Sequence, residues 1–187
     1  MAFLKSKLLR RIILTLILLW ATIAFWFLND IFSINILVSV ISLPILYLVW
    51  AEKSTNLVLI FLSFVSAFAL YGFLFYFNLP LWIIMLASVL IYGFLFTYLE
   101  QKLGILGRKR LVYLLLFSLL ILELFLILSY FLINPLNRSL IIALAAYLLS
   151  GFCFTIIPDK KTNSFSTYVT LFWMMIAVLL LTSSWGS

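Results

Sequence analysis

The chain has 187 residues, of which 67% are hydrophobic and 9% are charged, whereas a soluble domain is about half apolar and about a quarter charged. This composition excludes an ordinary soluble fold, and the length accommodates a single transmembrane domain over residues 1–187. The 12 basic and 5 acidic residues give a net charge of +7, but no soluble face is available to carry a basic groove for nucleic acid.

Seven apolar runs are long enough for a helix to cross the hydrocarbon core, which takes about 20 residues. They cover residues 12–28, 31–50, 57–77, 79–99, 111–133, 136–157 and 165–182. Pro80 and Pro135 suit the first turn of a helix, and Pro44 is expected to kink the second helix. A transmembrane barrel would need shorter segments of alternating polarity, so we predict an all-α membrane protein, a polytopic bundle of seven transmembrane helices.

The positions of Lys and Arg predict the orientation of these helices. If the N-terminus lies in the cytoplasm, 11 of the 12 basic residues fall on the cytoplasmic side and Arg138 alone falls outside. We therefore predict a cytoplasmic N-terminus and an external C-terminus, in a plasma membrane or prokaryotic inner membrane. The first helix is expected to remain as an uncleaved anchor, because its apolar run continues well beyond Ala24.

Glu123 is the leading candidate for a functional residue. It lies near the middle of the fifth run, among leucines, where an ionisable side chain is costly and marks a functional site by default. Two interpretations remain open: a proton or cation site, or a hydrogen bond that fixes the contact with another helix or subunit.

Several polar residues are expected near the depth of Glu123 and are candidates for the same intramembrane site. They are Asn35, Ser39, Ser42, Ser66, Ser88 and Tyr147. Asn35, Ser39 and Ser42 are spaced four and three residues apart and so share one helix face. This stripe either lines a polar path or, as is commoner for serine, bonds back to the carbonyls of its own helix.

Small residues predict one close helix contact. Ser139, Ala143, Ala146 and Ser150 form a smooth seam on the sixth helix, and Ser63 with Ala67 does the same on the third. Such seams let membrane helices approach closely, so we assign them to packing.

Two basic clusters are predicted at the cytoplasmic surface and are candidates for contact with anionic lipid headgroups. The first contains Lys5, Lys7, Arg10 and Arg11, and the second contains Lys102, Arg108, Lys109 and Arg110. Each charge in such a cluster attracts an anionic membrane surface by about 1 kcal/mol. Membrane topology alone would also place them there.

The residue inventory argues against most enzyme classes. The chain has no histidine and one cysteine, Cys153, so Ser–His, Cys–His and most metal-dependent mechanisms are excluded, and we predict no cofactor and no metal. Glu52, Glu100 and Asp159 share the predicted cytoplasmic side but lie in separate loops.

The sequence leaves three functions open. The first is a non-enzymatic subunit or scaffold of a membrane assembly, either with other membrane proteins or as a homo-oligomer. The second is a small proton- or cation-coupled transporter or channel that uses Glu123. The third is an enzyme that acts on lipid-linked substrates through the cytoplasmic carboxylates.

Overall fold

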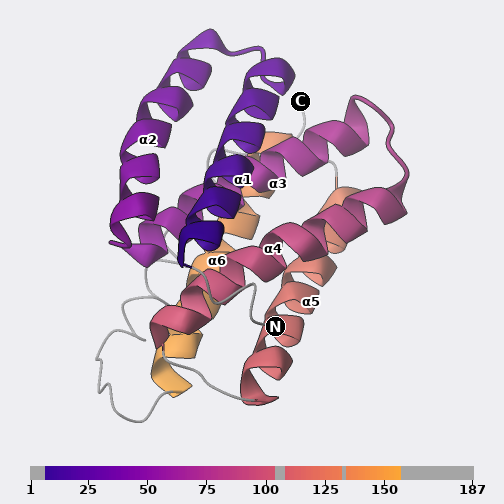
Figure 1. Cartoon of the computed structure of the whole chain (residues 1–187). Helices are drawn as coiled ribbons and strands as arrows, with labels where there is room; N and C mark the ends of the chain where they lie inside the picture. Colours follow the sequence, from indigo (N-terminus) through magenta and orange to yellow (C-terminus); the bar gives the residue numbers. More distant parts are fainter. Residues whose placement is uncertain (1–6, 104–107, 132–133, 157–187) are drawn as a thin grey trace.

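The computed structural model describes residues 7–103, 108–131 and 134–156, together with their side chains except those of 100–103, 108–111, 113 and 152–156. This part of the chain is all-helical, with six helices and no strand (Figure 1). The helices are α1 (Lys7–Leu28), α2 (Phe32–Ala51), α3 (Thr55–Phe75), α4 (Leu81–Leu103), α5 (Arg108–Tyr130) and α6 (Pro135–Ile156).

Six of the seven predicted helices are therefore present, and the predicted helix over 165–182 lies outside the described residues. The largest difference is at α1, which begins at Lys7 rather than at Ile12. Lys, Leu and Arg are good helix formers, so the helix includes the basic segment that precedes the apolar run. α6 begins at Pro135, where a proline fits, and α2 runs without interruption through Pro44.

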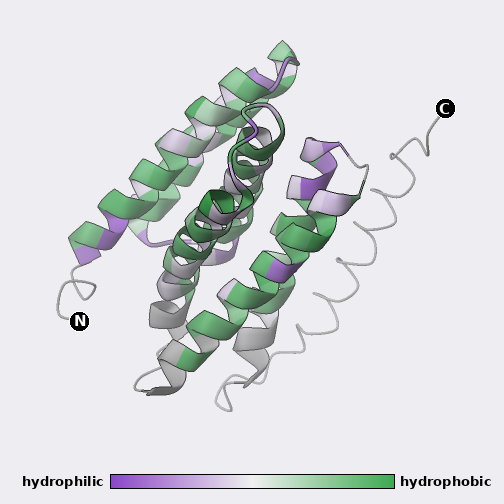
Figure 2. Ribbon diagram, turned by 90° about the vertical axis from the view of Figure 1, so that its right-hand side faces the viewer, coloured by the Kyte–Doolittle hydropathy of each residue, from purple (hydrophilic) through white to green (hydrophobic). Residues whose placement is uncertain are grey.

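Within the described ranges, four helices are long and apolar enough to cross a membrane by length and composition: α1, α2, α3 and the Leu81–Leu99 part of α4. Shorter apolar helical stretches, Leu114–Tyr130 and Pro135–Gly151, lie within α5 and α6. Hydrophobic residues cover most of the helix surfaces, and hydrophilic residues gather mainly near the helix ends (Figure 2). These are the properties of a multi-pass membrane protein.

α3 is the central helix of the bundle, and it packs against α1, α2, α4 and α6. Its most extensive contact is with α6, whose predicted seam of small residues (Ser139, Ala143, Ala146 and Ser150) is buried. Ser63 and Ala67 of α3 are also fully buried. Because lipid tails are as apolar as leucine, close van der Waals packing of this kind is what holds helices together in a membrane.

Successive helices run in opposite directions, so the bundle has two ends (Figure 1). We call them the Glu52 end, where α1 begins and α2 turns into α3, and the Asn29 end, where α1 turns into α2. The turn at the Glu52 end is tight, because Glu52 and Ser54 both adopt left-handed backbone conformations, with φ of 54° and 47°. Glu52 caps α2, and its backbone N–H donates to the carbonyl of Leu48.

Candidate functional site

Glu123 lies on the face of α5 that points away from the other described helices, and it is exposed. The residues that share this face are large and apolar, and each is more than two-fifths exposed: Val112, Leu115, Leu116, Leu119, Leu120, Ile127 and Tyr130. The opposite face of α5, which includes Phe117, Ile121 and Phe125, is fully buried against the rest of the bundle. The carboxyl group thus interrupts an otherwise apolar outer surface near its middle.

The structure separates Glu123 from the stripe formed by Asn35, Ser39 and Ser42. α5 packs against α4 and α6, whereas α2, which carries the stripe, packs against α1 and α3. Figure 1 shows α2 and α5 on different sides of the central helix. The three polar residues of α2 and the carboxylate of α5 therefore do not line one path.

The stripe on α2, together with Trp50, forms a series of hydrogen bonds with α1 and with Asn29 directly after it, which we call the α1–α2 ladder. Its bonds are Trp50 Nε1 to Thr15 Oγ1 at 3.2 Å, Thr22 Oγ1 to Ser42 Oγ at 3.1 Å, Trp26 Nε1 to Ser39 Oγ at 2.6 Å, and Asn29 Nδ2 to Asn35 Oδ1 at 2.8 Å. The numbers of the paired residues add to 64 or 65 in every case, which is the signature of two antiparallel helices in a fixed register.

The two serines in this ladder also bond to their own helix, as is common for serine. Ser39 donates to the carbonyl of Asn35 at 2.9 Å, and Ser42 donates to that of Val38 at 2.8 Å. Because a hydroxyl has one proton, each serine then presents only lone pairs to α1, and Thr22 must be the donor to Ser42. The stripe is a structural element of the α1–α2 hairpin.

Ser66 of α3 and Ser88 of α4 are fully buried inside the bundle, and neither hydroxyl has a hydrogen-bond partner among the described residues. Tyr147 of α6 is half-buried. Two tyrosines that were not among the predicted site residues do bridge helices. Tyr71 donates to the carbonyl of Phe125 at 3.0 Å, and Tyr92 donates to that of Ser63 at 3.2 Å.

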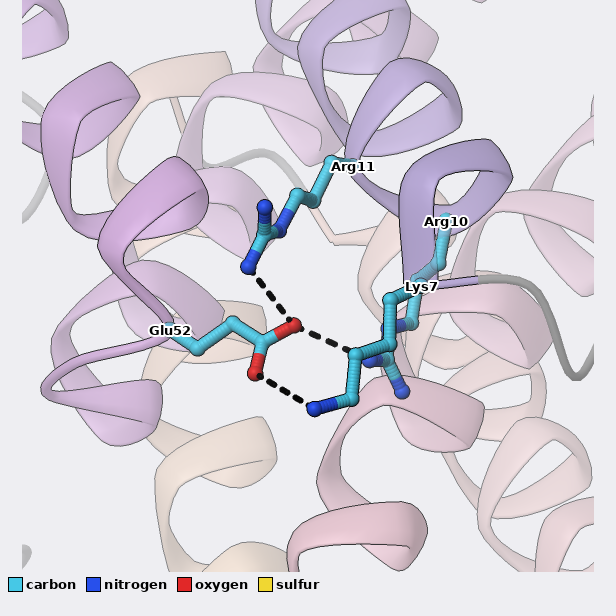
Figure 3. A network of polar contacts seen from close by, with 4 residues as sticks. All are labelled: Lys7, Arg10, Arg11 and Glu52. Carbon is cyan, nitrogen blue, oxygen red and sulfur yellow. Dashed lines mark hydrogen bonds and ion pairs between the residues drawn. The ribbon is translucent and has the colours of Figure 1, made fainter.

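Three basic side chains at the start of α1 converge on the carboxylate of Glu52 (Figure 3). The Oε1 atom lies 3.2 Å from Arg11 Nη2 and 3.4 Å from Arg10 Nη2, and Oε2 lies 4.0 Å from Lys7 Nζ. The Arg10 guanidinium also lies over the ring of Tyr98, 5.6 Å from its centroid. We call Lys7, Arg10, Arg11 and Glu52 the basic network.

The remaining members of the predicted basic clusters lie beyond what the structure describes. Lys5 precedes the first described residue, and Lys102, Arg108, Lys109 and Arg110 lie in α4 and α5 at positions whose side chains are not described. For the carboxylates considered for enzyme chemistry, Glu52 belongs to the basic network. The side chain of Glu100 and the whole of Asp159 are not described.

Arg138, which the sequence places at the opposite end of the bundle, is buried at 5% exposure. Its guanidinium carbon lies 4.3 Å from the ring centroid of Phe75 and 5.5 Å from that of Tyr71, and Nη2 donates to the carbonyl of Phe131. That carbonyl follows the last turn of α5, where the helix dipole favours a cation. Arg138 thus holds the Asn29 ends of α3, α5 and α6 together.

No family model, curated protein or solved structure matches the chain. Within the described ranges, no group of three or more His, Cys, Asp or Glu residues is placed to hold a metal ion. Glu123 and the basic network are the candidate functional groups that the described residues provide.

Proposed function

We propose that this protein is a non-enzymatic seven-helix membrane protein that serves as a subunit or scaffold of a membrane assembly. The orientation that we propose follows from the distribution of Lys and Arg. The Glu52 end faces the cytoplasm, the Asn29 end faces outward, and the segment 165–182 provides the seventh crossing. The same bias supports a plasma membrane or prokaryotic inner membrane as its location.

The observation that carries the proposal is the outward direction of Glu123. Carboxylates within transmembrane segments almost always face a bundle interior or a water-filled cavity, because exposure to lipid costs several kcal/mol. Glu123 instead lies on the exposed apolar face of α5. An assembly converts that face into an interior, so a partner helix that carries a basic or hydrogen-bonding side chain at the same depth is the occupant that we propose.

The transporter alternative requires Glu123 to join other polar groups along a path. The candidates on α2 are engaged in the α1–α2 ladder, and Ser66 and Ser88 are buried in the bundle rather than on its outer face. These placements favour an assembly surface over a transport path. The chemistry of lipid-linked substrates is likewise less favoured, because Glu52 is held among three cations.

The assembly surface is tested by photo-crosslinking in native membranes. A benzophenone amino acid is placed at Leu119, on the face of Glu123, and at Leu43 of α2 as a control, since both side chains are more than half exposed. We expect Leu119 to give an adduct whose added mass is not a multiple of the chain mass, and Leu43 to give none. A cross-linked product of twice the chain mass would show that the partner is a second copy of this chain, in a homo-oligomer. Equal reaction at both positions, or a cross-link within one chain, would refute a specific partner at this face.

Glu123 itself is tested with two substitutions that differ in hydrogen bonding. Glu123→Gln keeps a donor and an acceptor, and Glu123→Leu continues the apolar surface. We expect the partner to be retained by Glu123→Gln and lost from Glu123→Leu after extraction in mild detergent. A proton or cation flux in proteoliposomes that Glu123→Gln abolishes would instead establish the transporter.

A further inference from the structure

The basic network carries more positive charge than its single carboxylate can neutralise. Lys7, Arg10 and Arg11 contribute three positive charges and Glu52 one negative charge, so the network has a net charge of +2. The two arginines and the carboxylate are partly withdrawn from solvent, since the side chains of Arg10, Arg11 and Glu52 are 12%, 28% and 29% exposed, whereas Lys7 is 75% exposed. An excess of charge in such a place favours the binding of a further anion.

The hydrogen-bonding capacity of the two arginines is also mostly unused by Glu52. Each guanidinium offers five N–H donors, yet each reaches Glu52 through one nitrogen, and both contact the same oxygen. The distances of 3.4 Å and 3.2 Å are longer than the 2.7–2.9 Å typical of a charge-assisted hydrogen bond. The Nε atoms of Arg10 and Arg11 are buried and have no hydrogen-bond partner among the described residues.

The position of the network in the fold adds to its preference for an anion. Its three cations lie in the first described turns of α1, on one side of the carboxylate of Glu52. α3 begins at Thr55, three residues after Glu52, and its N-cap Ser54 makes no side-chain capping bond. A network with a net charge of +2, close to the N-terminus of α3, is suited to a multivalent oxygen anion.

We propose that Lys7, Arg10 and Arg11, positioned by Glu52, form a binding site for a phosphate-bearing anion at the membrane surface. Phosphate matches the fork of donors on arginine and supplies several acceptor oxygens at once. The same chemistry is available from the headgroup of an anionic phospholipid and from a soluble phosphate, and the test distinguishes the two sources. The site does not depend on the assembly function proposed for Glu123.

The site is tested by native mass spectrometry of the full, delipidated chain in detergent, titrated with phosphatidylglycerol, phosphatidylcholine or inorganic phosphate. We expect phosphatidylglycerol to bind preferentially, with Arg11→Gln weakening it about fivefold, the equivalent of about 1 kcal/mol for one lost charge. The matched control is Lys53→Gln, which removes the same charge next to Glu52 but outside the network, and it should change binding less than twofold. If inorganic phosphate displaces the lipid at millimolar concentration, the site is retained and its ligand is a soluble phosphate.

Glu52→Gln separates a ligand site from a network that only supports the fold. The substitution removes the charge of all three ion pairs but keeps an amide oxygen that can accept from the arginines, and it raises the net charge of the network to +3. A ligand site should therefore bind phosphatidylglycerol at least as tightly in Glu52→Gln as in the unmodified chain. Loss of binding in Glu52→Gln equal to that in Arg11→Gln, or an equal effect of Lys53→Gln, would overturn the proposal.

Discussion

Asn35 of α2 provides the most direct test of how the α1–α2 hairpin is held together. Its side chain is 4% exposed and makes two hydrogen bonds to Asn29, accepting from Nδ2 at 2.8 Å and donating to the backbone carbonyl at 2.9 Å. Asn35→Leu removes both bonds and keeps a side chain of similar size. Interhelical hydrogen bonds in membrane proteins are worth about 0.6 kcal/mol on average and at most about 1.7, so we expect a loss of about 1–2 kcal/mol.

The loss of stability caused by Asn35→Leu should exceed that caused by Ser39→Ala. Ser39→Ala removes one acceptor, that for Trp26 Nε1, at a position that is only half-buried, and we expect a loss near the average of about 0.6 kcal/mol. Both variants are measured by reversible unfolding in mixed detergent–SDS micelles, with far-UV circular dichroism as the readout. A cycle that combines Asn35→Leu with Asn29→Ala should show non-additive losses, since the two residues share their bonds.

Leucine is more soluble in lipid than asparagine, so the opposite outcome is physically possible and informative. If Asn35→Leu were as stable as the unmodified chain or more stable, the two hydrogen bonds of Asn35 would contribute no more to the hairpin than the leucine that replaces them.

Three further predictions concern contacts among α1, α3, α4, α5 and α6. Gly72→Ala should lower the stability and Gly93→Ala should not: a Cβ at Gly72 would lie 2.4 Å from Leu28 Cδ1, whereas one at Gly93 meets nothing closer than 3.8 Å. Overpacking at Gly72 costs about 1–3 kcal/mol, whereas replacing glycine by alanine stabilises either helix by about 1 kcal/mol. The free energies of unfolding of the two variants should therefore differ by the overpacking cost, as measured by thermal unfolding. Tyr71→Phe should lower the stability by about 0.6 kcal/mol in the same micelles, because it removes one interhelical hydrogen bond and keeps the ring. No loss would mean that this bond to the carbonyl of Phe125 does not stabilise the fold. Arg138→Lys should cost about 1–2 kcal/mol, because an ammonium cannot lie flat over two aromatic rings, and an unchanged melting temperature would show that charge alone matters there.

The helices were predictable because their signals are local. Long apolar runs, prolines and short polar breaks lie in the sequence itself, and six helices follow them closely. The seam formed by Ser139, Ala143, Ala146 and Ser150 was predictable for the same reason, since its spacing defines a face and its small size defines a close contact. The apolar run does not predict the extension of α1 back to Lys7, because Lys, Leu and Arg can continue a helix beyond it.

The direction in which a side chain points was not predictable, because it depends on which helices pack together. The sequence gives the depth of Glu123 but not whether it faces the bundle or the outside. The burial of Arg138 was missed for the same reason, since its position near a helix start indicates an exposed residue. The α1–α2 ladder did carry a signal: Thr22, Trp26 and Asn29 are spaced four and three apart, which mirrors the stripe on α2.

Glu52 and Glu123 lie in opposite electrostatic surroundings. Glu52 is surrounded by more positive charge than it can neutralise, whereas Glu123 lies among leucines and an isoleucine. Glu123 cannot neutralise the excess charge around Glu52, because it is fifteen residues from the start of α5 at the Glu52 end, about 22 Å along the helix. That distance is far beyond an ion pair or a hydrogen bond. Each site therefore calls for its own external group, an anion at the Glu52 end and a polar side chain of another helix near mid-depth, and losing either one should leave the other intact.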